Sequence, residues 1–180
     1  LQILDQCLVD KLLINQHNRC IGAIYIRHGK HHHIYANKGV ILCGGTIGSP
    51  QILLRSGIGA ADHLETLNIK PRVHLAGVGK NLHDHLLGAG NVYRSRRRLP
   101  QSKYQHSESL FYLNSDNSTS APDLVFACVT LPVLAEQFQP LSVGSAYTLL
   151  YGVTSPESRG SLRLQSADPY IPPVIDPRYL

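Results

Sequence analysis

The sequence predicts an α/β fold of mixed α+β type, and three observations support this class. Residues 1–14 and 20–27 alternate loosely between apolar and polar side chains, which is the period of β-strands. The run GVILC, residues 39–43, is continuously apolar, as expected of a parallel strand that is covered on both faces. From Ser49 onward the apolar residues take the spacing of a helix.

The first 45 residues are expected to form a β-meander that leads into this apolar run. The segment NQHNR, residues 15–19, has the composition of a turn between the first two strands. After the polar stretch HGKHHH, residues 28–33, the strand pattern resumes and ends at two glycines. Cys43 closes the apolar run, where a free thiol packs as a small core residue, so we expect no catalytic role for it.

Two short helices are expected next. Ser49 can cap a helix whose first residue is Pro50, because proline lacks only an amide hydrogen that the first turn does not use. Gly57 and Gly59 then end this helix. The segment AADHLETLN, residues 60–68, has the pattern of a second helix, and it is followed by a stretch rich in loop residues.

A change of composition near residue 89 indicates a domain boundary, so residues 1–88 and 89–180 are predicted to belong to different domains. The second part is polar and turn-prone, and its strands are expected to form an antiparallel sheet. Its apolar or alternating segments are residues 109–114, 123–130, 146–154 and 161–166.

Composition argues against several classes of function. No run of roughly 18 or more apolar residues occurs, so no membrane span is predicted. The net charge is +5, but the only dense basic run is residues 93–98, so no nucleic-acid partner is expected. The four cysteines lack metal-site and disulfide spacing, which favours free thiols and a cytoplasmic location. Because the chain starts at Leu1 in strand-like sequence and contains no Met, we expect it to be an internal part of a longer protein.

The Gly-rich and His-rich segments do not match common sites. GIGAAD and GVGKNL begin like dinucleotide loops but lack the third glycine, and neither is a P-loop. For the histidines of residues 28–33 a solvated turn is favoured over a metal site, and for NLHDHL, residues 81–86, a structural loop network is favoured. Ser56 lies at a helix end rather than in a nucleophile elbow, which argues against a hydrolase.

Residues 44–59, GGTIGSPQILLRSGIG, closely resemble the second signature of the glucose-methanol-choline (GMC) oxidoreductases, flavoenzymes that oxidise alcohols. Two further segments follow in the family's order. GVGKNLHDH, residues 77–85, is similar to the loop before the substrate domain, and residues 156–180 are similar to part of the substrate sheet. The stretch between them looks most like the branch that includes pyridoxine 4-oxidase.

The resemblance implies a fold, a cofactor and an activity. Residues 1–88 would be part of a Rossmann-like FAD-binding domain, and residues 89–180 part of an antiparallel-sheet substrate domain. The whole protein would use FAD to oxidise a primary or secondary alcohol by hydride transfer to the flavin, with O2 or another compound as electron acceptor. Small residues after the strand would let the backbone approach the ADP part of FAD.

The resemblance also assigns site residues. The expected catalytic His and its His or Asn partner lie outside these 180 residues, and no metal site is implied. The main chain of Val9 would contact the adenine edge. The expected cofactor-binding residues are Val9, Gly44, Gly45, Thr46 and Ser49. For Gly45 an alternative stays open, in which the glycine only permits a turn with positive φ.

Two other functions stay open beside the alcohol oxidoreductase. One is a lyase on the same fold, as hydroxynitrile lyases with the GMC fold are. The other is a non-catalytic relic or structural module from a split gene, which on its own would neither hold FAD nor catalyse a reaction.

Overall fold

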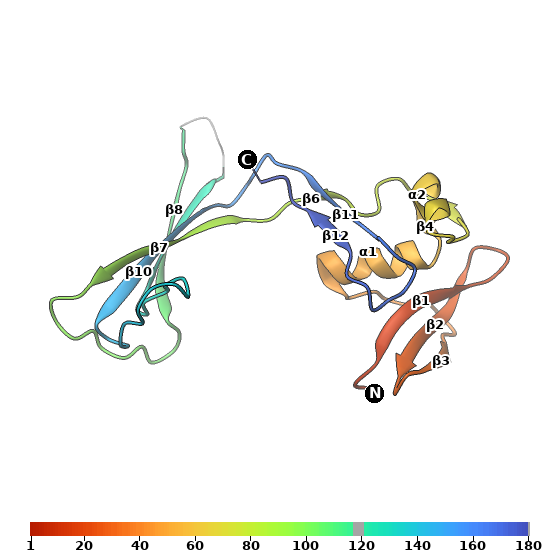
Figure 1. Ribbon diagram of the computed structural model, residues 1–180, viewed down its shortest axis with the longest axis horizontal. Coiled ribbons are helices and arrows are strands. Elements are labelled where there is room, and N and C mark those ends of the chain that lie inside the picture. Colours follow the sequence, from red (N-terminus) through yellow and green to blue (C-terminus); the bar gives the residue numbers. More distant parts are fainter. Residues whose placement is uncertain (117–120, 180) are drawn as a thin grey trace. The chain divides into compact units, whose positions relative to one another are not determined.

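The computed structural model describes residues 1–116 and 121–179, and within them the chain forms two compact units (Figure 1). One unit contains Leu1–His83 and the chain from Ser158 onward, and the other contains Asp84–Glu157. The predicted division at residue 88 therefore misses the return of the last segment to the first unit. That return occurs because strand β11 (Gly160–Arg163) pairs with β6 (Lys80–Leu82).

The first unit begins with the expected β-meander. Strands β1 (Leu8–Ile14), β2 (Cys20–Arg27) and β3 (Lys30–Tyr35) form an antiparallel sheet in sequence order. Strand β1 starts at Leu8 and not at residue 1 as predicted. His31, His32 and His33 lie in β3 and not in the turn that was predicted for residues 28–33, but all three are exposed, as expected of a solvated segment.

The apolar run at residues 39–43 is not a strand, which corrects the prediction of a buried parallel strand. Ile41 is 88% exposed, and Cys43 is exposed as well, so the expected core position of this thiol is also wrong. A parallel strand needs a neighbour on each side to bond its backbone groups. No strand of the described residues pairs with this run.

Helix α1 (Gly45–Arg55) starts earlier than predicted. Gly44 is the N-cap residue, and Pro50 lies inside the helix rather than at its first position. The Ser49 hydroxyl does act near the helix start, because its Oγ accepts the amide hydrogen of Gly44 at 3.0 Å. Ser49 lies inside the helix and does not precede it, as the predicted cap would. Its side chain bonds back to the residue before the first turn.

The helix ends as the glycines predicted, with Ser56 as the C-cap and Gly57 at φ 84°. Strand β4 (Ile58–Gly59) then pairs in parallel with β5 (Val73–His74). Helix α2 (Ala61–Thr66) lies between them in the chain and confirms the second predicted helix.

The core of the first unit joins segments that are far apart in the sequence. Leu54 of α1 and Leu64 of α2 pack against Leu162 and Leu164, which lie in and just after β11. Strand β12 (Val174–Asp176) completes a sheet with the order β12-β11-β6. The C-terminal segment is thereby fixed to α1, which bears on the site described below.

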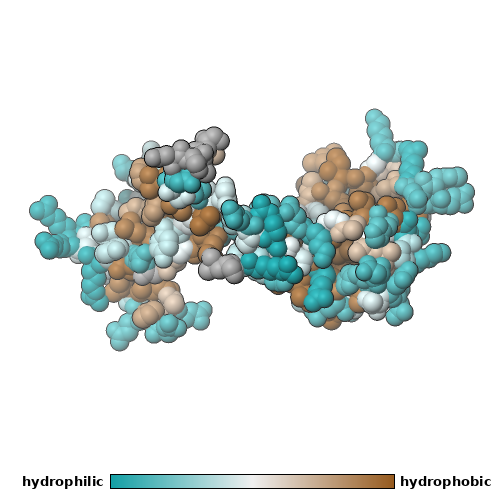
Figure 2. Space-filling view, turned by 90° about the horizontal axis from the view of Figure 1, so that it is seen from above, coloured by the Kyte–Doolittle hydropathy of each residue, from teal (hydrophilic) through white to brown (hydrophobic). Residues whose placement is uncertain are grey.

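The second unit is a four-stranded antiparallel sheet with the order β7-β10-β9-β8. Strands β8 (Ser107–Leu113), β9 (Leu124–Val129) and β10 (Ala146–Val153) confirm three of the four strands predicted for this part. The fourth, predicted at residues 161–166, is β11 and belongs to the first unit. Strand β7 (Leu86–Arg94) was not predicted, because two glycines interrupt its alternation. Phe111 of this unit is 60% exposed. Figure 2 shows hydrophobic residues on the surface of the unit.

The predicted α/β class with antiparallel sheets is confirmed. Within residues 1–116 and 121–179, neither helix is long and apolar enough to cross a membrane.

Candidate cofactor site

An open cavity of about 420 Å³ lies between the first turns of α1 and strand β6. It brings together the three segments that the sequence analysis singled out. Residues 44–59 contribute the start of α1, residues 77–85 contribute the chain around β6, and residues 156–180 contribute Leu162. The lining residues are Gly45, Thr46, Ser49, Pro50, Gly79, Lys80, Asn81, Leu82, His83 and Leu162.

Two adjacent glycines shape the start of α1 for different physical reasons. A Cβ on Gly44 would lie 2.9 Å from the amide nitrogen of Ser49, so the helix backbone itself requires a small residue there. Gly45 has φ 68° and no atom within 4 Å of the position of a Cβ. The positive-φ turn that was kept as an alternative for Gly45 is therefore present, and it stands beside open space.

The charge of the cavity suits an anionic group. The amides of the first helical turn carry the positive end of the helix dipole, and α1 has no acidic residue in its first turn. Lys80 is one of the lining residues, and no Asp or Glu lines the cavity. A diphosphate between two nucleosides carries the charge and the hydrogen-bond acceptors that such a lining can bind.

The wall opposite α1 is held in place by close backbone contacts between β6 and β11. The amide of Leu162 donates to the carbonyl of Gly79 at 2.7 Å. A Cβ on Gly79 would lie 2.1 Å from the carbonyl oxygen of Leu162, so only glycine fits. Beyond it, Nδ1 of His83 lies 3.0 Å from the carbonyl oxygen of Asn81, in agreement with the loop network expected for this segment.

The structure brings together four of the five predicted cofactor residues and separates the fifth. Gly45, Thr46 and Ser49 line the cavity, and Gly44 caps the helix that carries them. Val9 lies instead in β1, close to the other end of α1, where its carbonyl oxygen accepts a hydrogen bond from Arg55 Nη2 at 3.2 Å.

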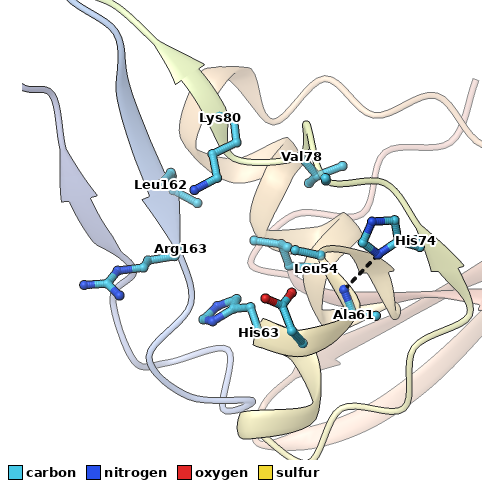
Figure 3. A pocket seen from close by; sticks show the side chains of 11 residues that line it. Leu54, Ala61, His63, His74, Val78, Lys80, Leu162 and Arg163 are labelled. Atoms are coloured by element: carbon cyan, nitrogen blue, oxygen red, sulfur yellow. Dashed lines mark hydrogen bonds between the residues drawn. The ribbon is translucent and has the colours of Figure 1, made fainter.

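A second cavity, of about 650 Å³, shares the lining residues Lys80 and Leu162 with the first (Figure 3). Its apolar lining includes Leu54, and its polar side chains include His63 and His74. The amide of Ala61 donates to Nδ1 of His74 at 3.3 Å, as the dashed line in Figure 3 marks. Sequence reasoning missed both histidines, because an isolated His in a helix or a strand has no informative spacing.

The other candidate groups of the sequence analysis do not converge on a site. Among residues 1–116 and 121–179, no three His, Cys, Asp or Glu side chains are grouped so that they could hold a metal ion. His32 stacks on Tyr25 across β2 and β3, with 5.2 Å between the ring centroids. The Ser56 hydroxyl is used within the fold, since it accepts the amide hydrogen of Leu12 at 2.8 Å.

Similarity to known proteins agrees with this geometry. A model of the GMC oxidoreductase family matches residues 1–87. The chain belongs to the GMC oxidoreductase family. The resemblance found in the sequence is thus confirmed, and the match spans the meander, α1 and the loop up to β7.

Several GMC relatives and structures resemble the chain over most of its length. It is 43% identical over 143 residues to pyridoxine 4-oxidase of Microbacterium luteolum, which covers 78% of the chain and 28% of that protein. It is 33% identical over 197 residues to human mitochondrial choline dehydrogenase, which covers 97% of the chain and 33% of that protein. The chain therefore spans about a third of the length of these relatives.

The crystal structure of pyridoxine 4-oxidase from Mesorbium loti matches with a TM-score of 0.84 and 38% identity, over 96% of this chain and 34% of that one. The structure of formate oxidase matches with a TM-score of 0.79 at 20% identity, over 93% of this chain and 38% of that one, which shows a shared fold.

Proposed function

We propose that this chain is part of an FAD-dependent oxidoreductase that oxidises a primary or secondary alcohol by hydride transfer to the flavin. The single observation that carries the proposal is the cavity at the start of α1, where three GMC-like segments meet around a helix N-terminus and Lys80. Relatives of the chain are named for the oxidation of pyridoxine and of choline, which supports a small-molecule alcohol as the substrate.

The residues at the cavity fit the ADP part of FAD. Gly45 presents its backbone to open space, so a cofactor can come into contact with the main chain there. Thr46 and Ser49 follow on the same helix, and Gly44 lets the chain turn tightly into it. The main-chain amide and carbonyl of Val9 would bind the adenine edge, as a strand can do without a polar side chain.

FAD supplies the hydride acceptor of the reaction, while the contribution of these residues is binding and orientation. We assign no residue of this chain to proton transfer, since the expected His and its partner lie outside it. The electron acceptor is O2 or another compound, the substrate is a small alcohol and the location is cytoplasmic. The identity to pyridoxine 4-oxidase supports placing the protein in that branch of the family.

The proposal is tested with the whole protein under anaerobic conditions. After reconstitution with FAD, addition of pyridoxine or choline should bleach the absorption band of the oxidised flavin, and O2 or an artificial acceptor should restore it. Cleavage of a cyanohydrin without flavin reduction would indicate the lyase. A protein that retains no flavin after reconstitution would contradict the proposal and favour the structural module.

A further inference from the structure

The last turn of α1 holds β1 through a buried arginine. Arg55 is 8% exposed, and its Nε donates to the carbonyl oxygen of Asp10 at 2.8 Å. Its Nη2 donates to the carbonyl oxygen of Val9 at 3.2 Å. Nε also lies 3.4 Å from Oδ1 of Asp10, which is itself 5% exposed, so the buried charge has a buried counter-charge.

This contact coincides with an irregularity in β1. Val9 pairs with Tyr25 and Lys11 pairs with Ile24, so Asp10 has no partner residue on β2 and forms a bulge. In a regular strand successive carbonyls point to opposite edges, and one side chain does not reach both. The bulge turns the carbonyls of Val9 and Asp10 toward the same guanidinium, whose planar fork of donors suits two acceptors.

A second pair of hydrogen bonds reinforces this attachment. Ser56 Oγ accepts the amide hydrogen of Leu12 at 2.8 Å and donates to the carbonyl of Ile52 at 2.5 Å. The C-terminal end of α1 is thus fixed on β1, while its N-terminal end lines the candidate cofactor cavity. A helix of 11 residues is about 16 Å long. It is a rigid connection between the cavity and Val9.

We infer that Arg55 is a positioning residue for cofactor recognition, which fixes the peptide groups of Val9 in the orientation that binds the adenine edge. The inference rests on the proposed function and extends it to a residue that itself touches no cofactor. A carbonyl oxygen has two lone pairs, so the oxygen of Val9 can accept from Arg55 and still accept from an adenine amino group.

The main alternative is that Arg55 only stabilises the fold as part of a buried ion pair. The two roles differ in what they do to base selectivity. A purely structural loss weakens the binding of every flavin dinucleotide to the same extent. A loss of positioning at Val9 weakens the preference for adenine over another base, because the discriminating hydrogen bonds lose their geometry.

The experiment uses the whole protein as apoprotein and two probes, FAD and the flavin dinucleotide that carries hypoxanthine in place of adenine. Hypoxanthine replaces the amino donor by a carbonyl and so reverses the hydrogen-bond pattern of that edge. The principal variant is Arg55→Lys, which keeps the charge opposite Asp10 but cannot donate in a fork to two carbonyls. The wild type should prefer FAD, and in the variant this preference should fall roughly tenfold, as for one lost hydrogen bond.

The matched control is Arg27→Lys on the neighbouring strand β2, where Arg27 pairs with Asp5 at 3.2 Å. Its preference for FAD should equal that of the wild type. A second variant, Ser56→Ala, leaves Arg55 paired and removes only the bond to Leu12, so it should keep the wild-type preference for FAD. If Arg55→Lys does not fold, Arg55→Gln takes its place, since its amide group can still donate to one carbonyl but not in a fork to both.

The outcomes separate the inference from the proposed function. If both dinucleotides bind more weakly to Arg55→Lys but in the wild-type ratio, Arg55 is structural and the inference is wrong, while the proposed function stands. If the wild type binds both dinucleotides equally, Val9 does not bind the base and the inference is again wrong. If the wild type binds neither of them, the proposed function fails.

Discussion

Substitutions at Gly45 test whether the open space beside it is cofactor space. The residue has φ 68°, so any side chain there is strained by roughly 1 to 2 kcal/mol. Outside the adjoining backbone no atom lies within 4 Å of an added Cβ, and the residue is exposed, so a side chain can extend into solvent in the apoprotein. Gly45→Ala and Gly45→Leu should therefore lower the free energy of unfolding of the apoprotein by the same amount.

The affinity for FAD should respond differently to the two variants. If the cofactor lies against Gly45, the methyl group of Ala lowers the affinity and the larger Leu side chain abolishes flavin retention. The assay pairs urea denaturation of the apoprotein with titration of FAD followed by flavin fluorescence. FAD binding of wild-type strength in Gly45→Leu would refute the reasoning and leave only the positive-φ turn. A greater loss of apoprotein stability in Gly45→Leu than in Gly45→Ala would show that another part of the protein fills the space.

Three further predictions concern charge and packing. Lys80→Gln should weaken FAD binding by about 1 kcal/mol and make the affinity less dependent on salt. Lys70 is exposed and lies outside the cavity, so Lys70→Gln should change neither the affinity nor its salt dependence in the same titration. Leu54→Ala should lower the free energy of unfolding by about 2 to 5 kcal/mol because Leu54 is 2% exposed, while Leu75→Ala, at a 50% exposed position, should cost far less in thermal denaturation. Hydrogen bonds from the hydroxyl and amide of Ser115 lower the pKa of Asp123 below 3.8, so this carboxylate stabilises the protein above pH 3.8 and the contribution is lost as the pH falls through the lowered pKa. Asp123→Asn should therefore be less stable than the wild type at neutral pH, and the difference should shrink in acid denaturation curves; a constant difference at all pH values would contradict the assignment.

Elements whose signal is local were predictable from the sequence. The alternation predicted the positions of β2, β8, β9 and β10 and the end of β1, because one face of each strand differs from the other in polarity. Gly57 predicted the end of α1, because a glycine with positive φ commonly follows the last residue of a helix. The start of α1 was misplaced, because Ser49-Pro50 is a common start signal and glycines at 44 and 45 are poor helix formers.

Elements that depend on distant partners were not predictable. The apolar composition of residues 39–43 does not show whether neighbouring strands are present, and without them the run is exposed. The pairing of β11 with β6 joins residues about 80 positions apart. No local sequence pattern therefore indicated that the last segment returns to the first unit.

The candidate site likewise combines a local motif that was predictable with contacts between distant residues that were not. The motif of residues 44–59 was found by resemblance, but its approach to Lys80 across a cavity is a property of the tertiary fold. Arg55 lies within that motif, and its partner Asp10 is 45 residues earlier in the chain. No spacing rule connects the two residues, because a β-bulge and a helix end bring them together.

The most direct test of the central claim is amide hydrogen exchange of the whole protein with and without FAD. If the cofactor reaches from the cavity between α1 and β6 to Val9 of β1, FAD should slow exchange at residues 45–49 and 79–83 and at Val9, and leave the exposed strand β3 unchanged. Retention of FAD with unchanged exchange in all three segments would contradict the account.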